Sequence, residues 1–118
     1  MSLVVYGIKN CNTVKSALQW LNEKKIPYAF HDFKTAGISG EKLKEWCAQT
    51  DWTTLVNKRG TTWRQLPLAV QAAITSRSTA IALMKEKPSL IKRPVIESGD
   101  KISTIGFDAD LFQERFMK

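Results

Sequence analysis

The hydrophobic positions of the chain follow a strand-like period in some segments and a helix-like period in others. Residues 3–8 are a short run of β-branched and aromatic side chains, which predicts a buried strand. A helix is predicted after a polar break, with Asn12 and Thr13 as residues of N-cap type at its start. Its apolar face is spaced i, i+3, i+4 and i+7 and consists of Val14, Ala17, Leu18 and Leu21. Residues 28–33 alternate again, so the first third of the chain is predicted to form a βαβ unit with parallel strands.

The middle of the chain predicts helices and turns only. Ser39 is expected to cap a helix whose apolar face is Leu43, Trp46 and Cys47, and Ser78 is expected to cap a helix that ends before Pro88. Shorter helical segments are predicted at residues 51–56 and 67–75, and loops are predicted at residues 35–40 and 58–62.

The last part of the chain predicts a hairpin followed by a helix. Residues 91–96 are extended, residues 98–100 are a turn signal, and residues 102–105 form the returning strand. Asp108 is expected to cap the closing helix. The order βαβ, helices, ββα predicts an α/β fold with a thioredoxin-like core and a helical insert at about residues 39–87, within a single domain of residues 1–118.

Composition and charge argue against a membrane protein and leave the partner open. No segment approaches the roughly 20 consecutive apolar residues of a membrane helix, and residues 1–6 are typical of a strand rather than a signal peptide, so we expect a cytoplasmic protein. The net charge of +7 fits two interpretations. One is a solvated, lysine-rich surface, and the other is attraction to an anionic partner such as glutathione, an oxyanion, nucleic acid or an acidic protein face.

Two cysteines, Cys11 and Cys47, are the candidates for chemistry. They form no C-x-x-C pair, and with His31 as the one histidine no metal site is expected. Cys11 falls between the first strand and the first helix, where free backbone N–H groups and the helix dipole favour an anion, so we expect a reactive thiolate there. Cys47 shares an apolar helical face, which is typical of a buried, unreactive thiol, and a role in resolving a disulfide at Cys11 stays open as the alternative.

Five segments taken together resemble the arsenate reductase (ArsC)/Spx family, and within it the YffB-like proteins. They are residues 5–13, 20–28, 56–64, 87–95 and Gly106-Phe107, and the resemblance spans about residues 3–116. It implies a thioredoxin-like core with a helical insert. It also implies that Cys11 is the catalytic thiol, that Arg93 helps to hold an anion at that thiol, and that Pro94 is a cis-proline.

The function that this resemblance implies is a glutathione-dependent thiol reductase. Cys11 would attack an oxidised thiol or oxyanion substrate or form a mixed disulfide with glutathione, and a second glutathione would release the product. Asn10, Asn12 and Thr13 would surround the sulfur. The candidates for binding the carboxylates of glutathione are Arg93, Lys9, Lys58 and Arg59. No tightly bound cofactor is expected, because glutathione acts as a co-substrate.

Two other functions stay open at this point. An arsenate reductase of this family works with glutathione and glutaredoxin and uses three arginines, whereas this chain has Asn57 and Gly106 at two of those positions. An Spx-like regulator would bind RNA polymerase without enzymatic activity. Many such regulators carry a C-x-x-C switch, but in this chain Val14 occupies the position of the second cysteine. We do not expect direct binding to nucleic acid, because no helix combines clustered Lys and Arg with a recognition pattern.

Overall fold

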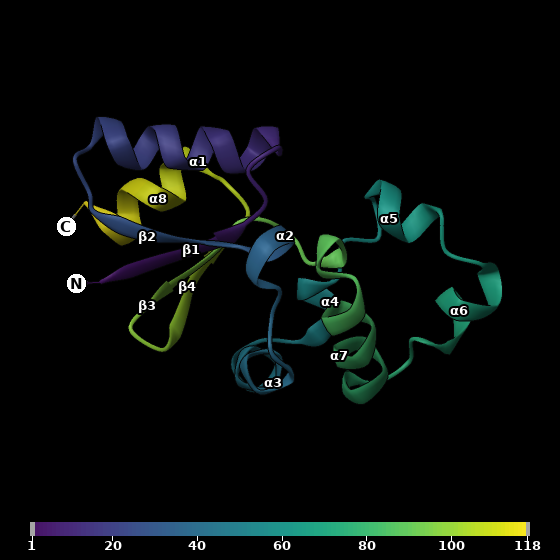
Figure 1. Ribbon diagram of the computed structural model, residues 1–118. Helices are drawn as coiled ribbons and strands as arrows, with labels where there is room; N and C mark the ends of the chain where they lie inside the picture. The colour runs from purple at the N-terminus through teal and green to yellow at the C-terminus, as the bar shows by residue number, and fades with distance from the viewer. Residues whose placement is uncertain (1, 118) are drawn as a thin grey trace. The chain divides into compact units, whose positions relative to one another are not determined.

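The computed structural model describes residues 2–117, which divide into two compact units (Figure 1). We call residues 2–36 and 93–117 the terminal unit, because it joins both ends of the chain, and Gly37–Lys92 the insert unit. The insert unit begins and ends a few residues outside the predicted helical insert of residues 39–87. None of the helices within residues 2–117 is both long and apolar enough to cross a membrane.

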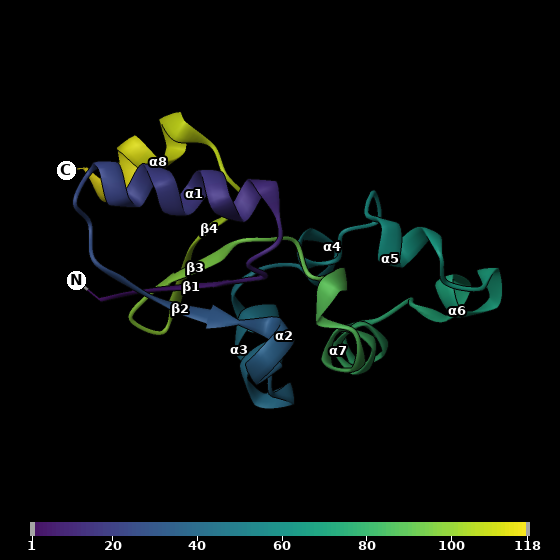
Figure 2. The ribbon, with the colours of Figure 1, turned by 45° about the horizontal axis from the view of Figure 1, so that its top comes forward.

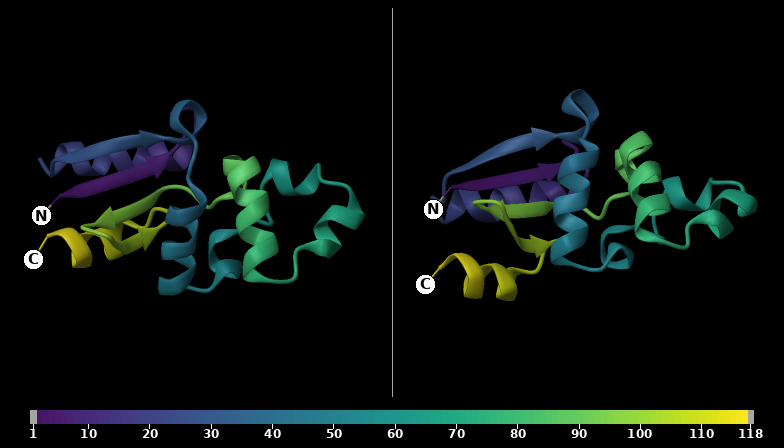
Figure 3. Two further views of the ribbon diagram at one scale, coloured as in Figure 1. Left: turned by 60° about the horizontal axis from the view of Figure 1, so that its bottom comes forward. Right: turned by 90° about the horizontal axis from the view of Figure 1, so that it is seen from below.

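The terminal unit is built on a four-stranded mixed sheet with the strand order β2-β1-β3-β4. β1 (Leu3–Gly7) pairs in parallel with β2 (Tyr28–Asp32) and antiparallel with β3 (Val95–Ser98). β3 and β4 (Lys101–Ile105) form an antiparallel hairpin, which Figure 3 shows from two sides. The predicted α/β class with a βαβ unit and a following hairpin is therefore confirmed.

Two helices, α1 (Asn12–Glu23) and α8 (Ala109–Phe116), cover one face of this sheet (Figure 2). Successive strand residues point to opposite faces, so alternate positions of β1 reach the helices. The buried cluster between sheet and helices consists of Leu3, Val5, Ala17, Leu21, Ile96 and Phe112. Asp108 caps α8 by accepting from the backbone N–H groups of Asp110 and Leu111, as the sequence predicted.

A buried polar pair lies on the other face of the sheet. Tyr6 alternates with Leu3 and Val5 and so points away from α1 and α8, and its hydroxyl donates to Oε1 of Glu97 at 2.8 Å. Glu97 is only 2% exposed, and the ring of Tyr6 also lies against His31 with a centroid distance of 4.8 Å. The pair therefore fastens β1 to β3 at a point that water barely reaches.

Short helices make up the insert unit. They are α3 (Gly40–Gln49), α4 (Trp52–Leu55), α5 (Thr61–Arg64), α6 (Leu68–Ala73), α7 (Arg77–Glu86) and the 3₁₀ helix η1 (Pro88–Leu90). Ser39 caps α3 by accepting from the N–H of Lys42 at 3.1 Å, as predicted. An isolated antiparallel bridge pairs Val56, which follows α4, with Ile91, which follows η1.

Three local predictions are wrong. Ser76, not Ser78, caps α7, because Ser76 and Thr79 form a reciprocal capping box that begins the helix earlier. The predicted loop at residues 35–40 overlaps α2 (Phe33–Ala36), a single helical turn that follows β2 directly. The predicted loop at residues 58–62 ends at Thr61, where α5 begins. Helices of four residues are too short to show a hydrophobic period.

Candidate active site

Cys11 itself is the N-cap of α1. β1 ends at Gly7, and Cys11 has the extended backbone angles φ −136° and ψ 122°, while its carbonyl already accepts the first helical bond from the N–H of Lys15 at 2.9 Å. Asn12 and Thr13, which the sequence suggested as caps, are instead the first two helical residues. The thiol therefore stands where the free N–H groups of the first helical turn converge.

These N–H groups and one arginine set the ionisation of the Cys11 thiol. Its partial burial raises the pKa, but hydrogen bonding from the backbone N–H of Val14, then the bond and positive charge of Arg93, and then the N–H of Thr13 all lower it. The net result is a pKa below the usual value for cysteine. The thiolate, which is the nucleophilic form, is correspondingly more abundant at neutral pH than in a free cysteine.

Arg93 reaches the thiol because of the pairing between β1 and β3. Tyr6 pairs with Val95, so the residues just after β1 lie beside the residues just before β3. The Arg93–Pro94 peptide bond is cis, as the resemblance implied, and Pro94 is buried. The carbonyl of Pro94 accepts from the N–H of Gly106 at 2.8 Å, which joins the end of β4 to the same edge. Two residues far apart in sequence, a thiol and a guanidinium, are thus brought together.

The other predicted site residues of the terminal unit have less direct positions. Lys9 and Asn10 are exposed in the bend before Cys11, and Asn12 and Thr13 are exposed at the start of α1. The resemblance implied that Asn10, Asn12 and Thr13 would surround the sulfur. The groups that lower its pKa are instead backbone N–H groups and Arg93. Val14 was not among the predicted site residues, although the general geometry of a helix start indicates its N–H.

Val14 is held in place by a close approach to β1. A Cβ atom added to Gly7 would lie 2.8 Å from Cγ2 of Val14, which is closer than real side chains allow. Val14 is fully buried and β-branched, so it has little freedom to move aside. A glycine at position 7 therefore lets the first turn of α1, with the N–H groups that face Cys11, lie tightly against the end of the strand.

The basic residues that were predicted to bind glutathione near position 58 belong to the insert unit. Arg59 is exposed, and its backbone N–H donates to Oδ1 of Asn57 at 3.2 Å. Nζ of Lys58 lies over the rings of Trp63 and Trp52, at 5.3 and 6.0 Å from their centroids. A role of Arg59 or Lys58 in binding at Cys11 stays a prediction.

Cys47, the second free cysteine, has the opposite electrostatic setting. It is 5% exposed on α3, and burial raises its pKa, with the charge of Arg77 opposing and that of Asp51 adding to the increase. This agrees with the interpretation of Cys47 as a buried thiol of low reactivity. Within residues 2–117, no three His, Cys, Asp or Glu side chains are grouped so that they could hold a metal ion.

The sheet order, the two covering helices and a cysteine at the first strand-to-helix junction, beside a cis-proline, define a thioredoxin-like protein. The model of the ArsC family matches residues 6–115, and the chain belongs to the ArsC family.

Comparison with individual proteins agrees with this assignment. An uncharacterized protein of Haemophilus influenzae is 42% identical over 114 residues, which are 97% of this chain and 98% of the relative. A solved structure of a protein named YffB superposes with a TM-score of 0.89 at 45% identity, covering 96% of this chain and 97% of the other. An arsenate reductase (ArsC) related protein from Brucella melitensis gives a TM-score of 0.78 at 40% identity, covering 98% of this chain and 95% of the other.

Proposed function

We propose that this protein is a thiol reductase in which Cys11 is the nucleophile and glutathione is the reducing co-substrate. The observation that supports this most directly is the lowered pKa of Cys11 at the N-cap of α1, with Arg93 beside the sulfur. A cysteine activated in this way attacks the sulfur of a disulfide at neutral pH, whereas an ordinary thiol is mostly protonated.

The reaction would proceed by two exchanges. The Cys11 thiolate attacks the glutathione sulfur of a mixed disulfide between glutathione and a substrate thiol, so that the Cys11–glutathione bond forms and the substrate thiolate leaves and takes up a proton. The thiolate of a second glutathione then attacks the glutathione sulfur bound to Cys11. This step releases oxidised glutathione and restores the Cys11 thiolate. Over the two exchanges, one reduced glutathione is consumed for each mixed disulfide, and the products are the substrate thiol and oxidised glutathione.

Arg93 has two roles in this scheme. Its charge stabilises the thiolate of Cys11 both before attack and after release, because that anion is the leaving group of the second exchange. A guanidinium also suits a carboxylate of glutathione, with which it forms charge-assisted bonds. Cys47 takes no part in the scheme, since its raised pKa and burial disfavour a resolving thiolate.

The test is the pH dependence of Cys11 alkylation, combined with mass spectrometry after exposure to oxidised glutathione. We expect a mixed disulfide on Cys11, turnover of a glutathione-mixed disulfide substrate that Cys11→Ser abolishes and Cys47→Ser preserves, and a higher alkylation pKa in Arg93→Gln. Arg115→Gln is the matched control, because Arg115 also donates from its guanidinium but does so to the backbone carbonyl of Ser103 in β4. An ordinary cysteine pKa for Cys11, with no mixed disulfide, would contradict the proposal.

Arsenate serves as the comparison substrate. Gly106, whose N–H donates to the carbonyl of Pro94, adds no charge next to Arg93. Each charge-assisted bond that an oxyanion adduct lacks is worth about 1.5–3 kcal/mol. We therefore expect arsenate turnover to be much slower than disulfide turnover. Faster turnover of arsenate than of the disulfide would assign the site to oxyanion reduction instead.

A further inference from the structure

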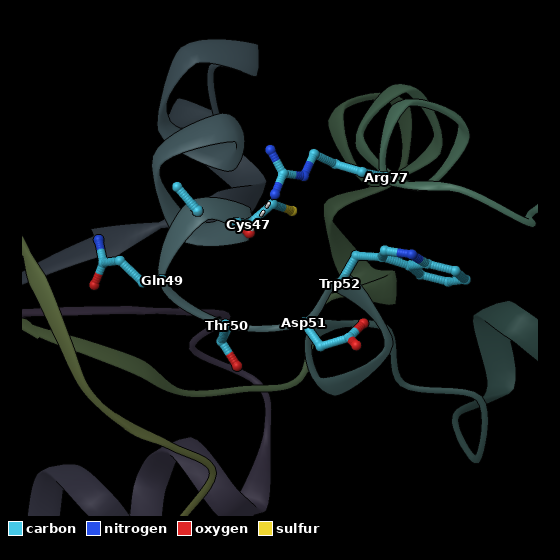
Figure 4. Close-up of a pocket in the computed structure, with 7 residues that line it drawn as sticks. Cys47, Gln49, Thr50, Asp51, Trp52 and Arg77 are labelled. Carbon is cyan, nitrogen blue, oxygen red and sulfur yellow. Dashed lines mark hydrogen bonds between the residues drawn. The ribbon is translucent and has the colours of Figure 1, made fainter.

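A cavity of about 420 Å³ lies in the insert unit, well within the size range of small-ligand sites. Its lining comes from the end of α3, the link to α4, and one side chain at the start of α7, as Figure 4 shows. The residues concerned are Cys47, Ala48, Gln49, Thr50, Asp51, Trp52 and Arg77. All of them belong to the insert unit.

One side of the cavity is electropositive. Arg77 is the first residue of α7, and its side chain extends from that helix toward α3 (Figure 4). Nη2 of Arg77 donates to the carbonyl of Cys47 at 3.1 Å (Figure 4). The other guanidinium N–H groups have no partner within residues 2–117. Arg77 is therefore held toward the cavity with most of its donors available for an anion.

The other side of the cavity is electronegative. Asp51 follows α3 and accepts from the backbone N–H of Thr53 at 3.0 Å and from the Thr53 hydroxyl at 2.9 Å. The backbone bond and then the hydroxyl bond lower the pKa of Asp51, with slight burial opposing, so the group is a carboxylate at neutral pH.

These two charges face one cavity without neutralising each other. Neither Arg77 nor Asp51 forms an ion pair with any residue of the described chain, 2–117. Both act on the sulfur of Cys47 between them, where the charge of Arg77 opposes and that of Asp51 adds to the rise in pKa that burial causes. A ligand that carries both signs of charge would satisfy both walls at once, whereas an ion of one sign would meet one attractive and one repulsive wall.

We propose that this cavity binds the α-amino-acid head group of a small zwitterionic ligand. The carboxylate of the ligand meets Arg77, and its ammonium group meets Asp51. The indole of Trp52 supplies a flat apolar wall for the remainder of the ligand. The site goes beyond the proposed reductase function, because it uses neither Cys11 nor Arg93. A free amino acid and the γ-glutamyl end of glutathione both present this head group.

The test is a titration of the full chain followed by backbone NMR. The probes are L-phenylalanine, 3-phenylpropanoate, which lacks the ammonium group, and 2-phenylethylamine, which lacks the carboxylate. We expect L-phenylalanine to shift the amide signals of residues 47–52 and 77, with each analogue binding at least about tenfold more weakly. A parallel titration with glutathione, in a Cys11→Ser chain, distinguishes the two sources of the head group. Equal binding of the three aromatic probes, or no shift at these amides, would overturn the proposal.

Four variants make the assignment specific to the cavity. Arg77→Gln and Asp51→Asn each remove one charge and keep hydrogen-bonding capacity, so each is expected to weaken the binding of L-phenylalanine about tenfold or more. Arg115→Gln and Asp108→Asn are the matched controls in the terminal unit and are expected to have no effect. If either charge variant fails to fold, Ala48→Trp, an exposed position on the cavity wall, is expected to block binding by filling the space. The site would be refuted if L-phenylalanine still bound to Ala48→Trp. It would also be refuted if the two control variants weakened binding as much as the two charge variants.

Discussion

The hydrogen bond between Tyr6 and Glu97 offers a stability measurement on the framework that holds the candidate site. Tyr6→Phe removes one hydroxyl and keeps the ring that lies against His31. Glu97 is 2% exposed, so water cannot readily replace the lost donor. Removing the donor of a hydrogen bond to a buried carboxyl group costs about 1–3 kcal/mol. At about 2.1 cal/mol/K of unfolding entropy per residue, this range lowers the Tm of the 118-residue chain by about 4–12 °C.

Urea denaturation of four proteins measures the bond itself. They are the parent, Tyr6→Phe, Glu97→Leu and the double variant, arranged as a double-mutant cycle. We expect the double variant to be more stable than the sum of the two single losses predicts, by about 1–3 kcal/mol, because each single change already breaks the same hydrogen bond. Additive losses would refute the reasoning. Glu97→Gln is the conservative control, since its amide oxygen still accepts from Tyr6.

Three further outcomes follow from single groups. The pKa of Cys11 is lower in the folded chain than in the unfolded one, so thiolate formation stabilises the folded chain increasingly as pH rises from the folded pKa to the unfolded value of about 8.5. Thermal melts across this pH range should show the increase in stability for the parent chain and its loss in Cys11→Ser. Thr104→Val should leave stability unchanged or raise it by about 1 kcal/mol in urea melts, because the buried hydroxyl of Thr104 has no hydrogen-bond partner within residues 2–117. Ser76→Ala should cost about 1 kcal/mol and Ser78→Ala less than about 0.5 kcal/mol, since only Ser76 caps α7; equal losses would contradict the capping box.

The strands and the long helices could be predicted because their side chains repeat with a clear period. The apolar face of α1 and the alternation in β1 and β2 needed no tertiary information. The cap of α1 was predicted at Asn12 or Thr13, but it is Cys11. Cysteine is not a usual cap type, and only the backbone angles of Cys11 and the hydrogen bond to its carbonyl show this role. For α7, both Ser76 and Ser78 are capping types, and the bonds made by Thr79 decide between them.

The candidate site was predictable in part. The position of Cys11 at a helix start follows from local sequence, and so does the direction of its pKa. Its contact with Arg93 depends on the pairing of β1 with β3, which no local pattern encodes and only the family resemblance suggested. The cavity beside Arg77 was not predicted at all, because it arises from the packing of α3 against α7.

The close approach of Gly7 to Val14 makes the acidity of the thiol depend on a residue of the strand that precedes it. Any larger residue at position 7 would displace the first turn of α1 and, with it, the N–H donor that favours the anion most. Sequence drift at this one strand position would thus alter the chemical reactivity of the protein while the loop around the sulfur stayed identical. A search for natural or engineered variants with altered redox behaviour should therefore include the strand as well as the loop.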